Sequence, residues 1–224
     1  MRTRPALALA MLLSAAVPRA QAPTPPAGFT VAPVLDNATI RATRLKLAPG
    51  AKEQPHTHPS SMLVVMLTAS EMEMKNGEKH TRGMRKVGEI EFIGAGVSHH
   101  AANVGAMPLE ALVVTIKPER VRGGIAPPAL AAQPGVTRKP LLDNHDVTVT
   151  RLEFEAEVRE PVHTHPYDLL IVPISSARLD MQLGHKKQVG RYAVGEAIFV
   201  PRGTAHAVAN VGTASFRLLG IRIK

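Results

Sequence analysis

The chain has 224 residues, of which 45% are hydrophobic, an ordinary share for a folded protein. It contains five Phe, two Tyr, no Trp and no Cys, which argues against aromatic stacking platforms for sugars or nucleobases and excludes disulfides and thiolate metal sites. The formal net charge is +9, but Lys and Arg form no long run, so we expect no nucleic-acid-binding arm.

Residues 1–22 have the three parts of a secretory signal peptide. Arg2 and Arg4 give a basic start, residues 6–17 are apolar, and Ala20-Gln21-Ala22 is a small-residue cleavage pattern. The apolar stretch is too short to cross a bilayer as a helix, and no other segment qualifies. We therefore expect a protein without a membrane span, exported to the bacterial periplasm or secreted, in which residues 23–33 are a linker.

After this leader, the sequence repeats itself with a constant offset of 107 positions. The repeated segments include Leu35-Asp36-Asn37 with Leu142-Asp143-Asn144, and Asn103-Val104-Gly105 with Asn210-Val211-Gly212. A register held without gaps over most of the chain indicates two copies of one domain. We place the first copy at residues 34–117 and the second at 141–224. Residues 118–140 are rich in Pro, Gly and Ala and are expected to be a linker between the two domains.

Each copy has the hydrophobic pattern of β-strands. Residues 40–47 and 147–154 alternate apolar and polar side chains, as in a sheet with one buried face. Short apolar runs at 62–67 and 169–174 predict strands covered on both sides. Further strands are expected around Met72–Met74 and Leu179–Met181, and at 90–93, 197–200, 109–116 and 216–223. Short strands with frequent turns and no helical period favour an all-β sandwich or barrel.

Three histidines occupy matching positions in the two copies, namely His56, His58 and His99 in the first and His163, His165 and His206 in the second. Residues i and i+2 of a strand face the same side, so both histidines of each His-Thr-His motif can point into one barrel interior. A turn could bring the third histidine to this pair. Neutral imidazoles suit Fe, Zn, Mn, Cu or Ni, so we predict one divalent transition metal per domain. The unmatched histidines are expected at the surface: His80, His100, His145 and His185.

These histidines and the residues around them resemble the two motifs of the cupin family. The second copy matches the second motif in full, at Gly195, Pro201, Gly203, His206 and Asn210. The first copy matches it at Gly88, Gly96, His99 and Asn103. The departures are Gly94, where Pro is usual, and Glu157, where the first motif has Gly. The resemblance implies two tandem double-stranded β-helix barrels, or cupin jelly rolls, that is, a bicupin.

The main departure from the cupin pattern is a missing glutamate ligand. The family has a glutamate three or four residues after its His-x-His pair, whereas both copies of this chain have apolar residues there. Asp168 is the nearest acid, and it is either a fourth ligand or an exposed carboxylate in a turn. Three neutral ligands leave the charge of a divalent metal uncompensated, which favours an anionic, chelating substrate. Some cupin dioxygenases have such three-histidine iron sites, whereas an oxalate-decarboxylase-type site would include the glutamate.

Two functions fit these residues. One is a metal-dependent enzyme, an oxidoreductase of the dioxygenase type, that acts on a small oxygen-rich organic acid, phenol or dicarbonyl. The alternative is a non-catalytic module that binds a small ligand or a metal, because cupins include both kinds and a fold does not decide function. The expected partner is a small molecule in either case. The sequence identifies no general base, and it favours the histidines of the second copy because their motif is more complete.

Overall fold

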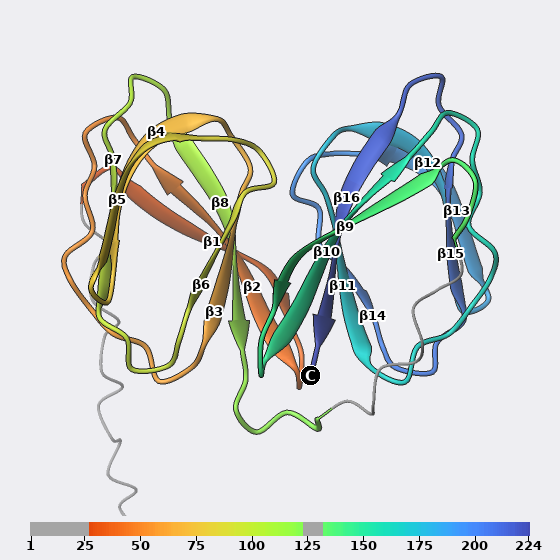
Figure 1. Ribbon diagram of the computed structural model, residues 1–224, viewed down its shortest axis with the longest axis horizontal. Helices are drawn as coiled ribbons and strands as arrows, with labels where there is room; N and C mark the ends of the chain where they lie inside the picture. The colour runs from red at the N-terminus through yellow and green to blue at the C-terminus, as the bar shows by residue number, and fades with distance from the viewer. Residues whose placement is uncertain (1–26, 123–131) are drawn as a thin grey trace, which may run out of the picture.

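The computed structural model describes residues 27–122 and 132–224. These residues form sixteen β-strands and no helix, which confirms the predicted all-β class. The two copies form two barrels that lie side by side, barrel 1 (residues 27–122) and barrel 2 (residues 132–224) (Figure 1). The predicted signal peptide, residues 1–22, lies outside the described residues. Nowhere in the two described ranges is there a helix with the length and hydropathy to cross a membrane.

The strands of the two barrels follow the repeat. Barrel 1 contains β1 (Phe29–Asp36), β2 (Ile40–Leu47), β3 (Met62–Met66), β4 (Ser70–Asn76), β5 (Lys79–Arg85), β6 (Ile90–Ile93), β7 (His99–Asn103) and β8 (Leu109–Ile116). Barrel 2 contains β9 (Val136–Asp143), β10 (Val147–Phe154), β11 (Asp168–Pro173), β12 (Ala177–Leu183), β13 (Lys186–Tyr192), β14 (Ile198–Val200), β15 (His206–Asn210) and β16 (Phe216–Ile223). Each strand of barrel 2 starts within one residue of the position that the 107-residue offset gives.

Each barrel consists of a five-stranded and a three-stranded antiparallel sheet. The five-stranded sheets have the orders β1-β2-β8-β3-β6 and β14-β11-β16-β10-β9, and the three-stranded sheets the orders β5-β4-β7 and β13-β12-β15. Under the 107-residue offset, the order of each sheet in barrel 2 is that of its counterpart in barrel 1, with the five-stranded order read from the opposite edge. Two tandem jelly-roll barrels were expected from the cupin motifs, and the structure confirms them.

Two strands begin inside segments that we expected to be linkers. Strand β1 begins at Phe29, within residues 23–33, and β9 begins at Val136, within residues 118–140. Both strands are edge strands that pair on one side only, with β2 and β10. They are largely exposed and each contains a proline, Pro33 or Pro140, which an edge strand tolerates. Such segments lack the apolar alternation of a central strand, which is why their sequence resembled linkers.

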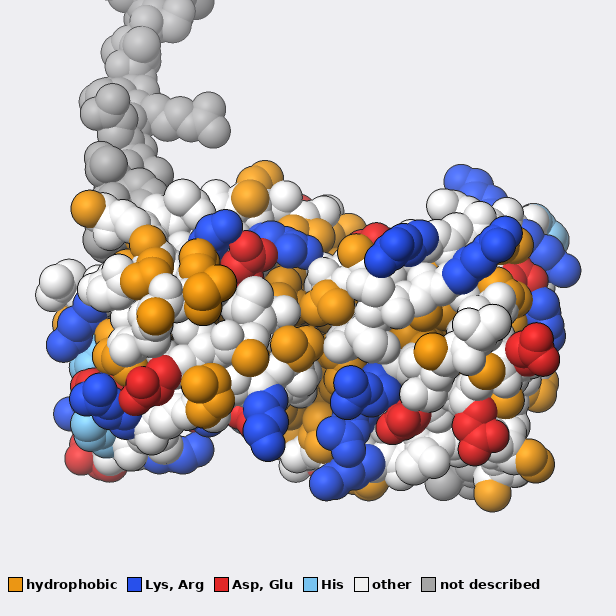
Figure 2. Space-filling model, turned by 90° about the horizontal axis from the view of Figure 1, so that it is seen from above, with side chains coloured by type: hydrophobic (Ala, Val, Ile, Leu, Met, Phe, Trp, Pro, Cys, Tyr) orange, Lys and Arg blue, Asp and Glu red, His pale blue; other side chains and the backbone are white. Residues whose placement is uncertain are grey.

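The two barrels pack together through the outer faces of their five-stranded sheets (Figures 1 and 2). One hydrophobic cluster of sixteen buried residues spans both barrels, and its members form eight pairs related by the 107-residue offset. The pairs are Ile40 and Val147, Ala42 and Val149, Leu63 and Leu170, Val65 and Val172, Leu67 and Ile174, Leu112 and Leu219, Val114 and Ile221, and Ile116 and Ile223. The interface is therefore self-complementary, as in a two-fold symmetric dimer.

Two glycines at this interface permit the close approach of the barrels. A Cβ atom on Gly88 would lie 2.6 Å from Cδ1 of Ile174, and one on Gly195 would lie 2.6 Å from Cδ1 of Leu67. Gly88 and Gly195 are repeat mates, and so are Leu67 and Ile174. Both glycines also have a positive φ, +81° and +80°, which favours glycine. The motif glycines thus have a role in packing one barrel on the other.

The two barrels also make two polar contacts, and both contacts join the same two repeat positions. Thr39 Oγ1 of barrel 1 donates a hydrogen bond to Asp168 Oδ2 of barrel 2 at 2.8 Å. Ser61 of barrel 1 makes a hydrogen bond with Asp146 of barrel 2. Thr39 and Asp146 are repeat mates, as are Ser61 and Asp168. Barrel 2 therefore supplies both carboxylates, and barrel 1 supplies both hydroxyls.

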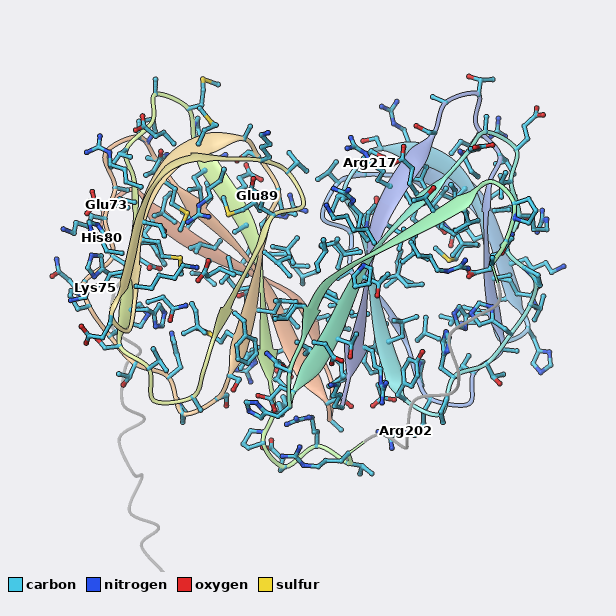
Figure 3. The ribbon with its side chains drawn as sticks, viewed as in Figure 1. Glu73, Lys75, His80, Glu89, Arg202 and Arg217 are labelled. Carbon is cyan, nitrogen blue, oxygen red and sulfur yellow. The ribbon has the colours of Figure 1, made fainter. Side chains whose placement is uncertain are left out.

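Each of these aspartates also binds an arginine. Arg202 donates to Asp168 from its backbone N–H (2.9 Å) and its guanidinium (3.1 Å), and Nη2 of Arg120 donates to Asp146 Oδ1 at 2.6 Å. Arg202 lies at the lower edge of barrel 2 in Figure 3 and also donates to the carbonyl of Val121 at 2.6 Å. Of the two alternatives for Asp168, an exposed turn carboxylate is wrong, and the group of candidate ligands in barrel 2 contains the three histidines without Asp168. Asp168 is 6% exposed, and its oxygens are engaged by Thr39 and Arg202.

Candidate metal centres in the two barrels

The structure brings the three matched histidines of each copy together. The backbones of His56 and His99 exchange two hydrogen bonds, of 3.0 and 2.9 Å, and those of His163 and His206 do the same. One ring nitrogen from each histidine lies within 4.8 Å of the others in each of two triads, His56, His58 and His99 in barrel 1 and His163, His165 and His206 in barrel 2. Each triad could therefore bind one metal ion.

The His-Thr-His segments are not regular strands, contrary to the prediction. His56 and His163 each make an isolated bridge to the first residue of β7 or β15. Pro59 and Pro166 directly follow the two motifs, and proline has no N–H to donate to a sheet ladder, which explains why no strand continues there. The motif is held instead by pairing with the strand that supplies the third histidine.

Backbone carbonyl groups orient four of the six imidazoles. In the first and third histidine of each triad, Nδ1 faces the carbonyl oxygen of the residue two positions earlier. The pairs are His56 with Gln54 (2.8 Å), His99 with Val97 (3.2 Å), His163 with Pro161 (2.8 Å) and His206 with Thr204 (3.3 Å). Because a carbonyl oxygen only accepts, Nδ1 carries the hydrogen, and the lone pair of Nε2 is left for a metal. Fixing the tautomer in this way is typical of metal-ligating histidines.

The triad of barrel 2 has the geometry of a metal site in one further respect. Nε2 of His163 lies 3.1 Å from Nε2 of His165, while Nδ1 of His165 is buried without a hydrogen-bond partner. With the His163 proton on Nδ1, His163 Nε2 accepts this hydrogen bond from Nε2–H of His165, and a metal ion bound by both Nε2 atoms would replace that proton, which would move to Nδ1 of His165. Burial lowers the pKa of His165 and of His206 to about 4, so both rings are neutral at pH 7. The donor set therefore fits a divalent transition metal.

The triad of barrel 1 is similar but more open. Burial lowers the pKa of His58 and of His99 below the ordinary range, which keeps their lone pairs available. His58 is partly exposed, whereas its repeat mate His165 is 7% exposed. The neighbouring ring centroids lie 4.4 to 5.2 Å apart, close to the 4.3 to 5.0 Å of barrel 2.

A glutamate, buried at Glu160 and partly buried at Glu53, accompanies each triad and was not singled out from the sequence. Glu53 and Glu160 are repeat mates, three residues before the first histidine, and line the two barrel cavities. Glu53 accepts a hydrogen bond from the N–H of Ala101 at 2.8 Å, and Glu160 lies 4.0 Å from Nε2 of His163. Burial raises the pKa of both carboxyl groups. Their identity across the repeat was the available signal, but the family's glutamate follows the histidines rather than preceding them.

A cavity adjoins each triad, and the two cavities differ in size and lining. The cavity of barrel 1 has a volume of about 580 Å³, and that of barrel 2 about 360 Å³. Both volumes lie in the range of small-molecule binding sites. Arg138 and Arg222 line the cavity of barrel 2, where barrel 1 has Val31 and Thr115 at the matching positions. The repeat therefore preserved the triads while the charge beside them changed.

The arginines of barrel 2 belong to a polar wall that sequence analysis did not identify. The guanidinium carbon of Arg222 lies 4.5 Å from the ring centroid of Tyr167, and this ring stacks on His165 with centroids 4.7 Å apart. Arg138 lies 3.6 Å from Glu160, and its Nε is buried without a hydrogen-bond partner. Two positive charges thus lie beside the histidines, where an anionic group could bind them.

None of the four unmatched histidines joins a triad. His80 lies on the outer face of barrel 1 beside Glu73, 3.2 Å away, as Figure 3 shows. The side chain of His145 is 72% exposed, and His185 is exposed as well, in line with the prediction. His100 is partly exposed and follows His99 in β7.

No protein-family model and no curated protein sequence matches this chain. Solved structures of similar fold include AerE from Microcystis aeruginosa, with 16% identity and a TM-score of 0.63 over 88% of this chain and 98% of that one. A cupin 2 conserved barrel domain protein from Leptotrichia buccalis has 15% identity and a TM-score of 0.58 over 91% and 92%. Salicylate 1,2-dioxygenase from Pseudaminobacter salicylatoxidans has 9% identity and a TM-score of 0.70 over 88% and 76%. Structures of that dioxygenase with gentisate are also similar. At these identities the similarity establishes the two-barrel cupin fold.

Proposed function

We propose that the protein is a metal-dependent oxidoreductase of the dioxygenase type that acts on a small, oxygen-rich organic acid. The observation that carries this proposal is the convergence of three imidazoles beside a cavity that is lined by two arginines. Barrel 2 is the proposed catalytic barrel. His163, His165 and His206 would hold a divalent metal there, with Fe, Mn, Zn, Cu and Ni all compatible with the donor set.

The protein's own residues would bind and orient the substrate. The metal would supply Lewis acidity and open coordination positions for a chelating substrate. Arg138 and Arg222 would attract the carboxylate of the substrate, and Tyr167, in contact with both Arg222 and His165, would orient these two side chains. Glu160 is the carboxyl group nearest to the histidines and is the candidate to accept a proton from a substrate hydroxyl.

Similarity to a gentisate-binding dioxygenase supports the choice of substrate class. Gentisate carries a carboxylate and two hydroxyl groups on one ring, a combination that the arginines and a metal at the triad would recognise together. The absence of a glutamate at the usual position removes a negative ligand from the site. An anionic substrate would then meet less repulsion.

The test is metal analysis followed by oxygen consumption. The purified full-length chain is loaded with Fe(II) and assayed with gentisate, catechols, dicarbonyls and hydroxy acids. We expect oxygen uptake with at least one carboxylate-bearing substrate and its loss in His206→Ala. Bound metal without turnover of any compound, unchanged by His206→Ala, would instead favour the non-catalytic binding module.

We also propose that the protein is exported to the periplasm or secreted. The support is the basic start, apolar stretch and small-residue cleavage pattern of residues 1–22. Mass spectrometry of the chain from a bacterial periplasmic fraction would test this. The expected product lacks about the first 22 residues, whereas an intact Met1 in the cytoplasmic fraction would contradict export.

A further inference from the structure

The cavity of barrel 1 is lined mainly by apolar side chains from both of its sheets. Met62 and Met66 come from β3 of the five-stranded sheet, and Met72 and Met74 from β4 of the three-stranded sheet. All four are buried, and all belong to the core cluster of this barrel. The other apolar lining residues include Phe29, Leu45, Leu47, Val64, Ile93 and Leu109.

A cavity of this size and composition needs an explanation. Its volume of about 580 Å³ lies in the range of small-molecule binding sites, and methionine and leucine side chains are prominent in its lining. Methionine is flexible and polarisable and recurs at surfaces that bind apolar partners of varied shape. The wall therefore fits a ligand better than it fits a packed core.

In the metal-free protein, charge disfavours anionic ligands in this cavity. Among the described lining residues, no Lys or Arg is present, because Val31 and Thr115 stand where barrel 2 has Arg138 and Arg222. Glu53 lines the cavity, and its carboxyl group accepts a hydrogen bond from the backbone N–H of Ala101. An anion beside Glu53 would lie near a carboxyl group without a cation to offset its own desolvation.

We propose that barrel 1 is a binding site for an uncharged, largely apolar small molecule, different in kind from the anionic substrate of barrel 2. Val31 is 50% exposed and lines the cavity, so the cavity reaches solvent at β1. The ligand enters there and its apolar body contacts the four methionines. This site goes beyond the proposed enzyme function, and it does not depend on metal or turnover.

The test uses metal-free, full-length protein and two fluorescent probes with the same ring system. N-Phenyl-1-naphthylamine is uncharged, and 1-anilinonaphthalene-8-sulfonate carries a sulfonate. We expect one equivalent of the uncharged probe to bind, with the sulfonate at least 10-fold weaker at the same site. Because no metal or substrate is present, failure of this experiment would leave the proposed enzyme function untouched, and the reverse also holds.

Matched variants assign the site. Ala111→Phe fills the cavity of barrel 1 and is expected to weaken binding of the uncharged probe at least 10-fold, whereas Leu218→Phe, its repeat mate in barrel 2, is expected to leave it unchanged. If Ala111→Phe does not fold, Val31→Arg is the second variant. This variant gives barrel 1 the arginine that barrel 2 has at the matching position, and Val31 is half exposed. It should weaken binding of the uncharged probe and strengthen binding of the sulfonate.

Several results would overturn the proposal. They are non-saturable binding of the uncharged probe, equal affinity for both probes at the barrel 1 site, or no response to either Ala111→Phe or Val31→Arg. Binding that weakens as the protein concentration rises would show that a second copy of the chain covers the cavity, and would overturn it as well.

Discussion

The two barrels have the same backbone fold and each has a histidine triad, but the side chains that line the cavity beside each triad differ. Barrel 2 presents Arg138, Arg222 and Tyr167, whereas barrel 1 presents methionines and a larger volume. The repeat preserved the positions that fix the fold, the interface and the triads. Ligand-facing positions diverged. Conservation between the copies therefore identifies the shared chemistry, and divergence between them identifies what each barrel binds.

The largest difference between the barrels is expected in turnover. His206→Ala should reduce oxygen consumption at least 100-fold, because it removes a proposed ligand from the barrel that binds the substrate. His99→Ala removes the matching ligand of barrel 1 and should cause a much smaller loss. Both rates are measured on protein whose fold is checked by circular dichroism. Equal losses in the two variants would contradict the assignment of catalysis to barrel 2.

Acid should destabilise the metal-free protein through the triad of barrel 2. The pKa values of His165 and His206 are about 4, below the ordinary value of 6.5, so the unfolded chain binds protons between these pH values that the folded chain does not. The free energy of unfolding should fall as the pH drops from 6.5 to 4, by up to about 3 kcal/mol per histidine.

Urea unfolding at pH 7 and pH 4.5 measures this effect. His165→Gln with His206→Gln should flatten the pH dependence. The matched pair His58→Gln with His99→Gln should flatten it less, because His58 is more exposed than His165. A pH-independent unfolding midpoint in the unmodified protein would contradict the expectation.

The ion pairs of Asp146 and Asp168 should differ in their contribution to stability. Asp146→Asn leaves the guanidinium of Arg120, which is 3% exposed, without its counter-charge, and should cost about 3 kcal/mol. Asp168→Asn affects Arg202, which is 34% exposed, and should cost about 1 to 2 kcal/mol. Urea unfolding at pH 7 gives both values. If Asp168→Asn lowers the free energy of unfolding more than Asp146→Asn does, the exposure of the paired arginine does not determine which ion pair is stronger.

The smallest effect is expected for substrate recognition. Arg138→Val gives barrel 2 the residue that barrel 1 has at Val31, and should raise the KM for gentisate or the best acidic substrate about 10-fold. Arg138→Lys should recover part of the loss. An unchanged KM would remove Arg138 from the recognition of the substrate carboxylate.

The sequence predicted most of the strands and both triads. The 107-residue offset is strong evidence for duplication, and residues 40–47, 90–93, 109–116, 147–154 and 216–223 form strands with the expected bounds. The edge strands β1 and β9 were not predicted, because a strand that pairs on one side only and is largely exposed need not alternate apolar and polar side chains. The His-Thr-His motifs converge without forming strands, because their position depends on long-range pairing with β7 and β15.

What the sequence did not reveal is which face of each strand lies inside a barrel. The alternation of β2 and β10 suggested a sheet with one buried face, but both faces are covered. Ile40 and Ala42 pack against the other barrel, while Thr43 and Leu45 line the cavity. The most regular apolar face is thus the interface between the barrels. Arg222 lines the cavity of barrel 2, although sequence analysis did not single it out.

Metal content measured on the full-length protein tests the central claim most directly. After reconstitution with Fe(II) or Zn(II) and removal of free metal, we expect about two equivalents per chain. His206→Ala and His99→Ala should each retain about one equivalent, and the double variant should retain none. Less than about 0.1 equivalent in the unmodified protein, or full metal content in the double variant, would contradict the assignment of the two triads as metal centres.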